Sequence, residues 1–133
     1  MHEKEINHRD IKPENILIAG NGIVKLADFG QAKKRMDEMS FKTSPSGTYL
    51  YRAPELDDED IEFHDKNAID VYALACAIYE LCTFKKAKLK KDKILVKDQG
   101  YSEGLHNLIM RMLVDIDDPN EKRPTIQEVI SEL

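Results

Sequence analysis

The sequence predicts a mainly helical domain with one small β-hairpin near its start. Two short runs rich in β-branched residues, 16–19 and 23–26, flank Asn21 and its two glycine neighbours, a pattern typical of a tight hairpin. Segment 67–83 is apolar almost all round, which predicts a fully buried helix. Helical periodicity returns towards the C-terminus, where apolar residues recur every three to four positions.

Two amphipathic helices are expected in that C-terminal part. Ser102 is placed to cap the first helix, whose apolar positions follow helical spacing at Leu105, Leu108, Ile109, Met112 and Leu113. The second helix follows Pro124 and begins with a capping box formed by Thr125 and Glu128. Its single apolar face carries Ile126, Val129, Ile130 and Leu133.

Composition points to one globular domain and excludes several classes of protein. The chain has 133 residues, of which 41% are hydrophobic and 34% are charged, a balance that suits a folded domain rather than a disordered one. A net charge of −5 argues against nucleic acid as a partner. No cationic and apolar leader opens the chain, and the longest apolar run, 71–79, is too short to span a bilayer. We therefore expect no membrane partner and a cytoplasmic or nuclear location.

The cysteines and histidines do not suggest a disulfide or a zinc site. Cys76 and Cys82 both lie in the apolar segment, so two buried thiols in a reducing compartment are favoured over a disulfide. His2, His64 and His106 have no cysteine or histidine partners at the spacing of zinc ligands.

The residues that can carry chemistry are concentrated in segment 8–15, which reads His-Arg-Asp-Ile-Lys-Pro-Glu-Asn. This segment places an acid, a cation and an amide at fixed offsets. Asp-Phe-Gly follows at 28–30 and Ala-Pro-Glu at 53–55. Each motif alone has an ordinary interpretation, such as a turn, a solvated ion pair or a helix start with proline in its first turn.

Taken together, these motifs resemble the catalytic loop, the metal-binding turn and the end of the activation segment of eukaryotic protein kinases. They follow the order of the family over essentially the whole chain. Lys12, two positions after the aspartate, resembles the serine/threonine branch rather than the tyrosine branch. The resemblance implies transfer of the ATP γ-phosphate to serine or threonine hydroxyls of a protein substrate.

The resemblance also implies a fold, namely the C-terminal lobe of the kinase domain, which belongs to an α+β family fold. The chain would be one partial, truncated kinase domain over 1–133, divided into a catalytic loop 8–15, a hairpin 16–26, an activation segment 28–55 and a helical part 67–133.

Four residues match the chemical roles that phosphoryl transfer requires. Asp10 would orient the substrate hydroxyl and accept its proton. Asn15 and Asp28 would hold Mg²⁺ with ATP, because hard oxygen ligands suit this ion. Lys12 would place a point charge on the transferring phosphate, so it belongs to both the catalytic and the ATP-binding residues.

Other residues match structural roles in the family. Glu55 would form a buried ion pair with Arg123, and breaking such a pair from one side costs roughly 3–5 kcal/mol. Asp70 would accept backbone N–H groups from the catalytic loop, which accounts for an acid beside so much apolar surface. His8 would pack against Phe29.

The segment between the metal-binding turn and Ala-Pro-Glu is expected to be a long exposed loop with two functions. Gly47 and Thr48 resemble the substrate-site turn, where Thr48 would hydrogen-bond near Asp10. Ser44 lies where many relatives are phosphorylated by an upstream activating kinase, and Arg9 could bind that phosphate. The alternative is a merely flexible polar loop.

The departures from the family concern the N-terminal lobe. The 133 residues include no glycine-rich phosphate loop, no strand lysine and no glutamate to pair with that lysine. Segment 1–4 resembles only the last residues of the helix that precedes the catalytic loop in the family. We therefore expect very weak or no activity from this chain alone, and an apolar patch on the helix 67–83. Other kinase subunits are conceivable partners, and the alternatives are a non-catalytic docking or decoy module or a truncated gene product.

Overall fold

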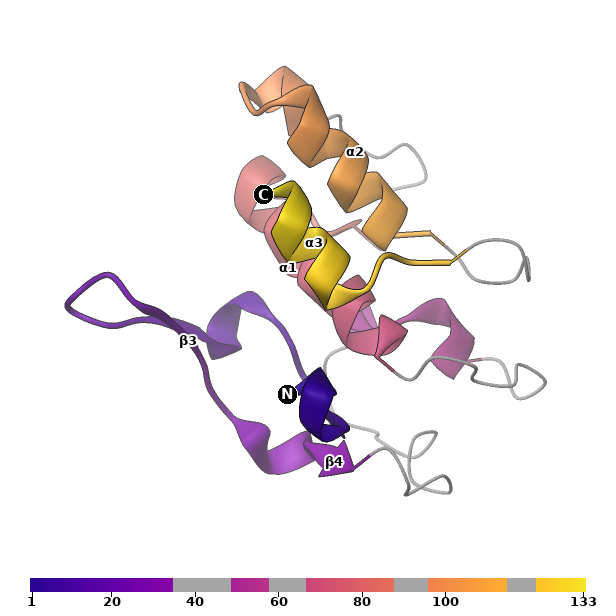
Figure 1. Ribbon diagram of the computed structural model, residues 1–133. Coiled ribbons are helices and arrows are strands. Elements are labelled where there is room, and N and C mark those ends of the chain that lie inside the picture. The colour runs from indigo at the N-terminus through magenta and orange to yellow at the C-terminus, as the bar shows by residue number, and fades with distance from the viewer. Residues whose placement is uncertain (35–48, 58–66, 88–95, 115–121) are drawn as a thin grey trace.

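The computed structural model describes residues 1–34, 49–57, 67–87, 96–114 and 122–133. Its helices and strands, in chain order, are η1 (His2–Lys4), β1 (Ile6–Asn7), η2 (Pro13–Asn15), β2 (Ile16–Ile18), β3 (Val24–Leu26), η3 (Phe29–Gln31), β4 (Lys33–Lys34), η5 (Tyr49–Tyr51), η6 (Pro54–Leu56), α1 (Ala68–Thr83), η8 (Val96–Gln99), α2 (Glu103–Met112) and α3 (Ile126–Glu132). The η elements are short 3₁₀ turns. In Figure 1 the α-helices lie together, and the β2–β3 hairpin projects away from them.

The predicted hairpin is present. β2 and β3 pair in antiparallel register, with Ile18 opposite Val24. The turn between them is closed by a hydrogen bond of 2.8 Å from the Gly22 N–H to the Ala19 carbonyl. Gly22 has a φ of 79°, a left-handed conformation that glycine adopts without steric cost. The glycine of this turn is therefore required by the backbone geometry.

The predicted central helix is also present as α1, and most of its side chains are buried. Ala75 and Tyr79 are completely shielded from solvent, and the thiols of Cys76 and Cys82 are buried. The helix ends where Phe84 adopts a left-handed conformation, with φ of 56°. Within the described part of the chain, none of the helices combines the length and the apolar character needed to cross a bilayer.

Helices α2 and α3 begin at the caps that the sequence predicts. The Leu105 N–H donates to the Ser102 hydroxyl oxygen over 3.1 Å, and Thr125 forms the capping box with Glu128 at the start of α3. Leu108, Ile109 and Met112 of α2 are buried in the core, and Leu105 packs against it partly buried. The apolar face of α3 is divided. Val129 is buried, whereas Ile130 and Leu133 are exposed, because only one side of this short helix packs against the core.

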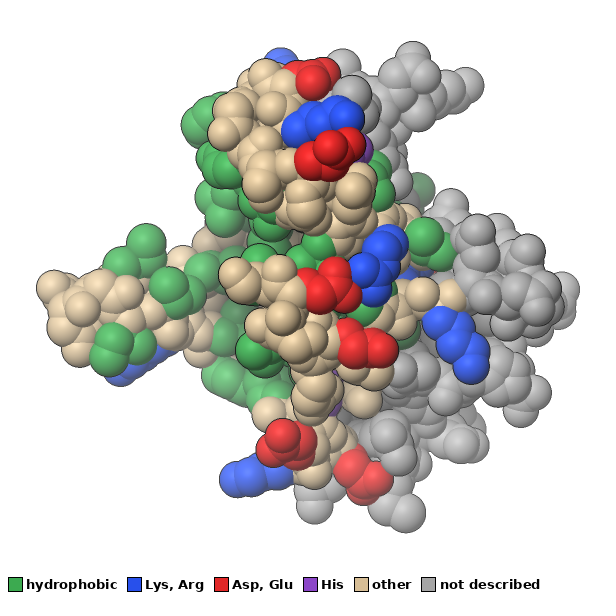
Figure 2. Space-filling view, turned by 45° about the horizontal axis from the view of Figure 1, so that its top comes forward, with side chains coloured by type: hydrophobic (Ala, Val, Ile, Leu, Met, Phe, Trp, Pro, Cys, Tyr) green, Lys and Arg blue, Asp and Glu red, His purple; other side chains and the backbone are tan. Residues whose placement is uncertain are grey.

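An apolar groove with a volume of about 610 Å³ lies between the N-terminal turn, the hairpin, α1 and α3. Its lining residues are Met1, His2, Ile11, Pro13, Ile16, Ile18, Val24, Leu26, Asp70, Val71, Leu74, Ile78, Leu81 and Ile126. Figure 2 shows hydrophobic side chains gathered where the projecting hairpin meets the helices. The apolar patch expected on α1 is therefore present, and the N-terminal turn and the hairpin form its other walls.

Candidate active site

Segment 8–15 lies between β1 and β2, and the short β1–β4 pairing holds its start. Asn7 of β1 is opposite Lys33 of β4, so the chain that follows the Asp-Phe-Gly turn returns beside the loop. At the other end, Pro13 opens the turn η2, and the Asn15 N–H donates to the Lys12 carbonyl over 3.0 Å. Proline suits this first position because its fixed φ is already close to the helical value.

Two polar side chains of this loop converge on the Asp10 carboxylate. The Lys12 ammonium lies 2.7 Å from Asp10 Oδ2. The Asn15 amide nitrogen donates to the Asp10 carbonyl over 2.8 Å and to Asp10 Oδ2 over 3.1 Å. Asp10 and Asn15 are both buried. Both bonds of Asn15 use its nitrogen, so they leave its side-chain oxygen available to another ligand.

The Asp-Phe-Gly turn is shaped by its own backbone. Asp28 has a left-handed φ of 57°, and its Oδ1 accepts a hydrogen bond of 3.1 Å from the Gly30 N–H. A Cβ atom on residue 30 would lie 3.1 Å from that same oxygen, so glycine is the residue that fits this contact. The Asp28 side chain is exposed to solvent.

His8 joins the loop to this turn. Its ring lies 4.8 Å from the Phe29 ring in an edge-on arrangement. His8 Nε2 is 2.9 Å from the Ala27 carbonyl, and His8 Nδ1 accepts a bond of 3.3 Å from the Asp10 N–H. These contacts assign a neutral ring with the proton on Nε2. His8 therefore connects the backbone before Asp28 to the backbone of Asp10.

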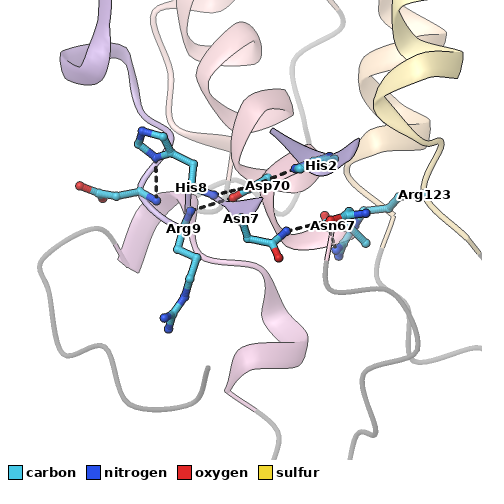
Figure 3. A network of polar contacts seen from close by, with 9 residues as sticks. His2, Asn7, His8, Arg9, Asn67, Asp70 and Arg123 are labelled. Carbon is cyan, nitrogen blue, oxygen red and sulfur yellow. Dashed lines mark hydrogen bonds and ion pairs between the residues drawn. The ribbon is translucent and has the colours of Figure 1, made fainter. Parts of the chain in front are cut away.

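The Asp70 carboxylate, at the start of α1, holds the beginning of the loop (Figure 3). Its oxygens accept the N–H groups of His8 over 2.7 Å and of Arg9 over 2.8 Å. Arg9 has a left-handed φ of 69°, which is unusual for a residue other than glycine. Burial lowers the pKa of the Arg9 guanidinium, and the nearby Asp70 charge opposes that effect. The loop is thus tied to the central helix through its backbone.

The ion pair expected between Glu55 and Arg123 is present and fully buried. Arg123 Nη2 lies 2.9 Å from Glu55 Oε2, and Arg123 Nη1 donates to the other carboxylate oxygen. The same guanidinium donates to the Val114 and Ala68 carbonyls and lies over the Tyr72 ring. These contacts satisfy a charge that would otherwise be costly to bury.

Two sets of polar contacts in the structure were not predicted from the sequence. His2 Nε2 forms a hydrogen bond with the Asp70 carboxylate. In the sequence, the spacing of His2 from other histidines and cysteines had been used only to argue against a zinc site. Tyr51 donates to Glu80, and Lys86 contacts both of these residues. Burial and the Glu80 carboxylate raise the pKa of Tyr51 to about 12, while hydrogen bonds to Glu80 and Tyr51 raise the pKa of Lys86. No local signal in the sequence links these distant residues.

Three predicted residues lie outside the described part of the chain. These are Ser44, Gly47 and Thr48, which the sequence interpretation assigns to a phosphorylation site and a substrate-site turn.

The comparison with known families settles the family of this chain. The family model described as "Protein kinase domain" matches residues 1–133. The chain belongs to the protein kinase family. The prediction of this family is therefore confirmed, and it is an enzyme family.

The relatives of this kinase chain are named as serine/threonine kinases or kinase-like proteins. This chain is 36% identical to mouse serine/threonine-protein kinase Nek3 over 124 residues, which cover 85% of this chain and 24% of Nek3. A probable serine/threonine-protein kinase nek3 of Dictyostelium discoideum is 34% identical over 141 residues, with 96% of this chain and 12% of the relative covered. Human cyclin-dependent kinase-like 2 is 44% identical over 80 residues, which covers 60% of this chain and 16% of that protein. The chain spans a quarter or less of the length of these relatives.

Proposed function

We propose that the chain is the C-terminal lobe of a serine/threonine protein kinase domain that transfers the ATP γ-phosphate to hydroxyls of a protein substrate. Its catalytic loop is 8–15, its hairpin is 16–26 and its activation segment is 28–55, with a helical part at 67–133. The observation that carries this proposal is the convergence of Lys12 and Asn15 on the buried Asp10 carboxylate. The family match supports the reaction class.

In this proposal Asp10 orients the attacking hydroxyl. The hydroxyl oxygen forms a bond to the γ-phosphorus while the bond from that phosphorus to the β–γ bridging oxygen breaks, and the hydroxyl proton passes to Asp10. ADP leaves with the bridging oxygen. Lys12, whose ammonium lies 2.7 Å from Asp10, adds positive charge where the phosphate carries its developing negative charge.

The residues present fit a magnesium ion with ATP. The side-chain oxygen of Asn15 is not used in the bonds to Asp10, and the Asp28 carboxylate is exposed with Oδ1 turned to the Gly30 N–H. Oxygen atoms of a carboxylate and an amide are ligands that Mg²⁺ prefers. Asn15 and Asp28 would hold the ion, which when bound neutralises phosphate charge.

We further propose that this chain transfers phosphate very weakly or not at all by itself. These 133 residues contain neither a glycine-rich phosphate loop nor the strand lysine that holds the α- and β-phosphates. Positioning and electrostatic stabilisation supply nearly all of the rate in this chemistry, so the loss of the phosphate clamp removes most of it.

Metal binding tests the proposed site independently of turnover. Titration of the isotope-labelled chain with Mn²⁺ and ATP should broaden the NMR signals around Asn15 and Asp28. Asp28→Asn should weaken this broadening, because a neutral amide binds the ion less well than a carboxylate. Asp10→Asn serves as the matched control, since Asp10 is not a proposed ligand. Broadening that is absent in the wild type, or unchanged in Asp28→Asn, would contradict the proposed metal site.

A phosphotransfer assay on the same samples tests the catalytic assignment. Any transfer to a protein substrate should disappear in Asp10→Asn, whereas transfer that persists in this variant would rule out Asp10 as the catalytic base.

A further inference from the structure

Lys86 belongs to a cluster of polar contacts that the proposed mechanism does not use. Its ammonium lies 2.5 Å from Glu80 Oε1 and donates to the Tyr51 hydroxyl oxygen. The same ammonium lies 4.8 Å from the centre of the Tyr51 ring, and the Tyr51 hydroxyl donates to the other Glu80 oxygen. A cation of this chain is therefore held by a carboxylate, a hydroxyl and an aromatic ring, which are groups that bind ammonium and guanidinium ions.

The end of α1 brings Lys86 to this place. Phe84 has a left-handed φ of 56°, which ends the helix and turns the chain. The Lys85 N–H then donates to the Thr83 hydroxyl oxygen over 3.2 Å, so the backbone before Lys86 is tied to the last residue of α1. Because Lys86 is tethered close to Glu80, its effective concentration at the carboxylate is high, and any free cation must compete with it.

The cluster borders the catalytic loop. Glu14 belongs to segment 8–15, four positions after Asp10, and its side chain is exposed. Burial and the Glu80 carboxylate raise the pKa of Tyr51 to about 12, and the Glu14 charge adds to this effect, so Glu14 lies within electrostatic range of the cluster. Tyr51 also follows the predicted substrate-site turn by three positions. A protein substrate that presents a hydroxyl to Asp10 would therefore pass beside Glu14 and Glu80.

The balance of charge determines which substrate side chain this place favours. Glu14 and Glu80 are acids, and Lys86 supplies a positive charge that is already bound to one of them. The Glu80 and Lys86 side chains are 23% and 29% exposed, so solvent and ligands can reach this pair, unlike the buried pair of Glu55 and Arg123. Without Lys86, the two acids and the hydroxyl would attract a lysine or arginine side chain of the substrate.

We propose that Lys86 is a specificity-determining residue of this chain. It takes, from within the chain, the place beside Glu80 and Tyr51 that a basic side chain of a protein substrate would otherwise occupy. Selection for basic substrates is thereby suppressed, and substrates with uncharged flanks are accepted equally well. The catalytic meaning of this inference rests on the proposed function, but peptide binding measures it without turnover.

Peptide binding to the full chain, followed by NMR titration, tests this proposal. One probe is a short serine peptide with arginines on both sides of the serine, and the other carries glutamines in their place. The ratio of their dissociation constants in the wild type gives the preference that net charge alone produces. In Lys86→Met this preference for the arginine peptide should rise about tenfold, as expected for one new hydrogen bond to a charged group. The Tyr51 and Glu80 amide signals should shift on binding.

Three further variants separate the local contact from the overall charge. Lys85→Met removes the same charge from the neighbouring exposed lysine and should change the preference by less than about twofold. Lys86→Arg keeps a cation at the same place and should behave as the wild type. Adding Glu80→Gln to Lys86→Met removes the acid that the arginine would bind, and should return the preference to the wild-type value.

An unchanged preference in Lys86→Met, or no binding of the arginine peptide to this variant, would overturn the proposal. The same conclusion would follow from an equal rise in Lys85→Met, from a rise in Lys86→Arg, or from a rise that persists when Glu80→Gln is added. Failure of the proposed function would appear differently, as missing Mn²⁺ effects at Asn15 and Asp28 while the preference that depends on Lys86 remains.

Discussion

Tyr51 shows how one buried hydroxyl can make the stability of this kinase chain depend on pH. Its side chain is 5% exposed, and its hydroxyl lies between the Glu80 carboxylate and the Lys86 ammonium. A phenolate at this place would be buried beside the negative charge of Glu80. The hydroxyl is therefore favoured in its neutral form, and its pKa is raised from 10.0 to about 12.

The pH dependence of folding should report this raised pKa. An unfolded chain loses the Tyr51 proton near pH 10.0, whereas the folded chain keeps it to about pH 12, so the unfolded state binds fewer protons between these values. The free energy of unfolding should consequently fall as the pH rises through this interval. Urea unfolding at several alkaline pH values measures this slope.

Tyr51→Phe is the matched variant for that measurement, because it keeps the ring and removes the ionisable group. It should reduce the alkaline loss of stability, although the raised pKa of Lys86 would contribute a loss of the same sign. An identical slope in Tyr51→Phe and wild type would disprove the assignment to Tyr51.

At the scale of elements, the β2–β3 hairpin depends on one of its two turn glycines. Gly22 has a φ of 79°, whereas Gly20 has no such conformation, and neither glycine has an atom within 4 Å of a Cβ position. A methyl group would therefore fit without a clash at either glycine, and the two positions differ in their backbone conformation.

Alanine substitutions should separate these two glycines. Gly22→Ala should lower the free energy of unfolding by about 1 kcal/mol, because an L-residue is strained at positive φ. Gly20→Ala should change it by less than about 0.5 kcal/mol. Urea midpoints of the two variants and the wild type provide the measurement. Equal midpoints for the two variants would show that the hairpin turn does not require the left-handed conformation.

At the scale of the whole molecule, Arg123 connects parts that lie far apart in the sequence. Its guanidinium contacts Glu55 in η6, the Ala68 carbonyl at the start of α1, and the Val114 carbonyl after α2. The Arg123 and Glu55 side chains are 0% and 1% exposed. Arg111 and Glu132 form a second arginine–glutamate pair between α2 and α3, but its side chains are 52% and 39% exposed.

Removing each arginine should therefore have unequal effects. Arg123→Met leaves Glu55 buried and unpaired, and should cost about 3–5 kcal/mol of unfolding free energy. Arg111→Met should cost less than about 1 kcal/mol, because water and salt already screen that pair. Chemical denaturation of both variants compares them directly. Similar losses would mean that burial does not determine the strength of these pairs.

Much of this chain could be predicted from local sequence signals. Asn21 and its glycine neighbours mark the hairpin, Ser102 and Thr125 mark the helix starts, and segment 8–15 identifies the family. These signals work because turn conformations, helix caps and loop motifs depend on residues within a few positions of each other. Glu55 and Arg123, which are distant in sequence, could be paired only through the resemblance to the family.

Only the tertiary structure decided the contacts that no local pattern or motif encodes. His2 meets Asp70 across 68 positions, and Tyr51 meets Glu80 across 29 positions. Periodicity placed Ile130 on an apolar face, but the packing of α3 left it exposed. The physical reason is the same in each case: burial and long-range hydrogen bonding depend on which elements come to lie side by side, whereas the local sequence determines only the conformation of each element.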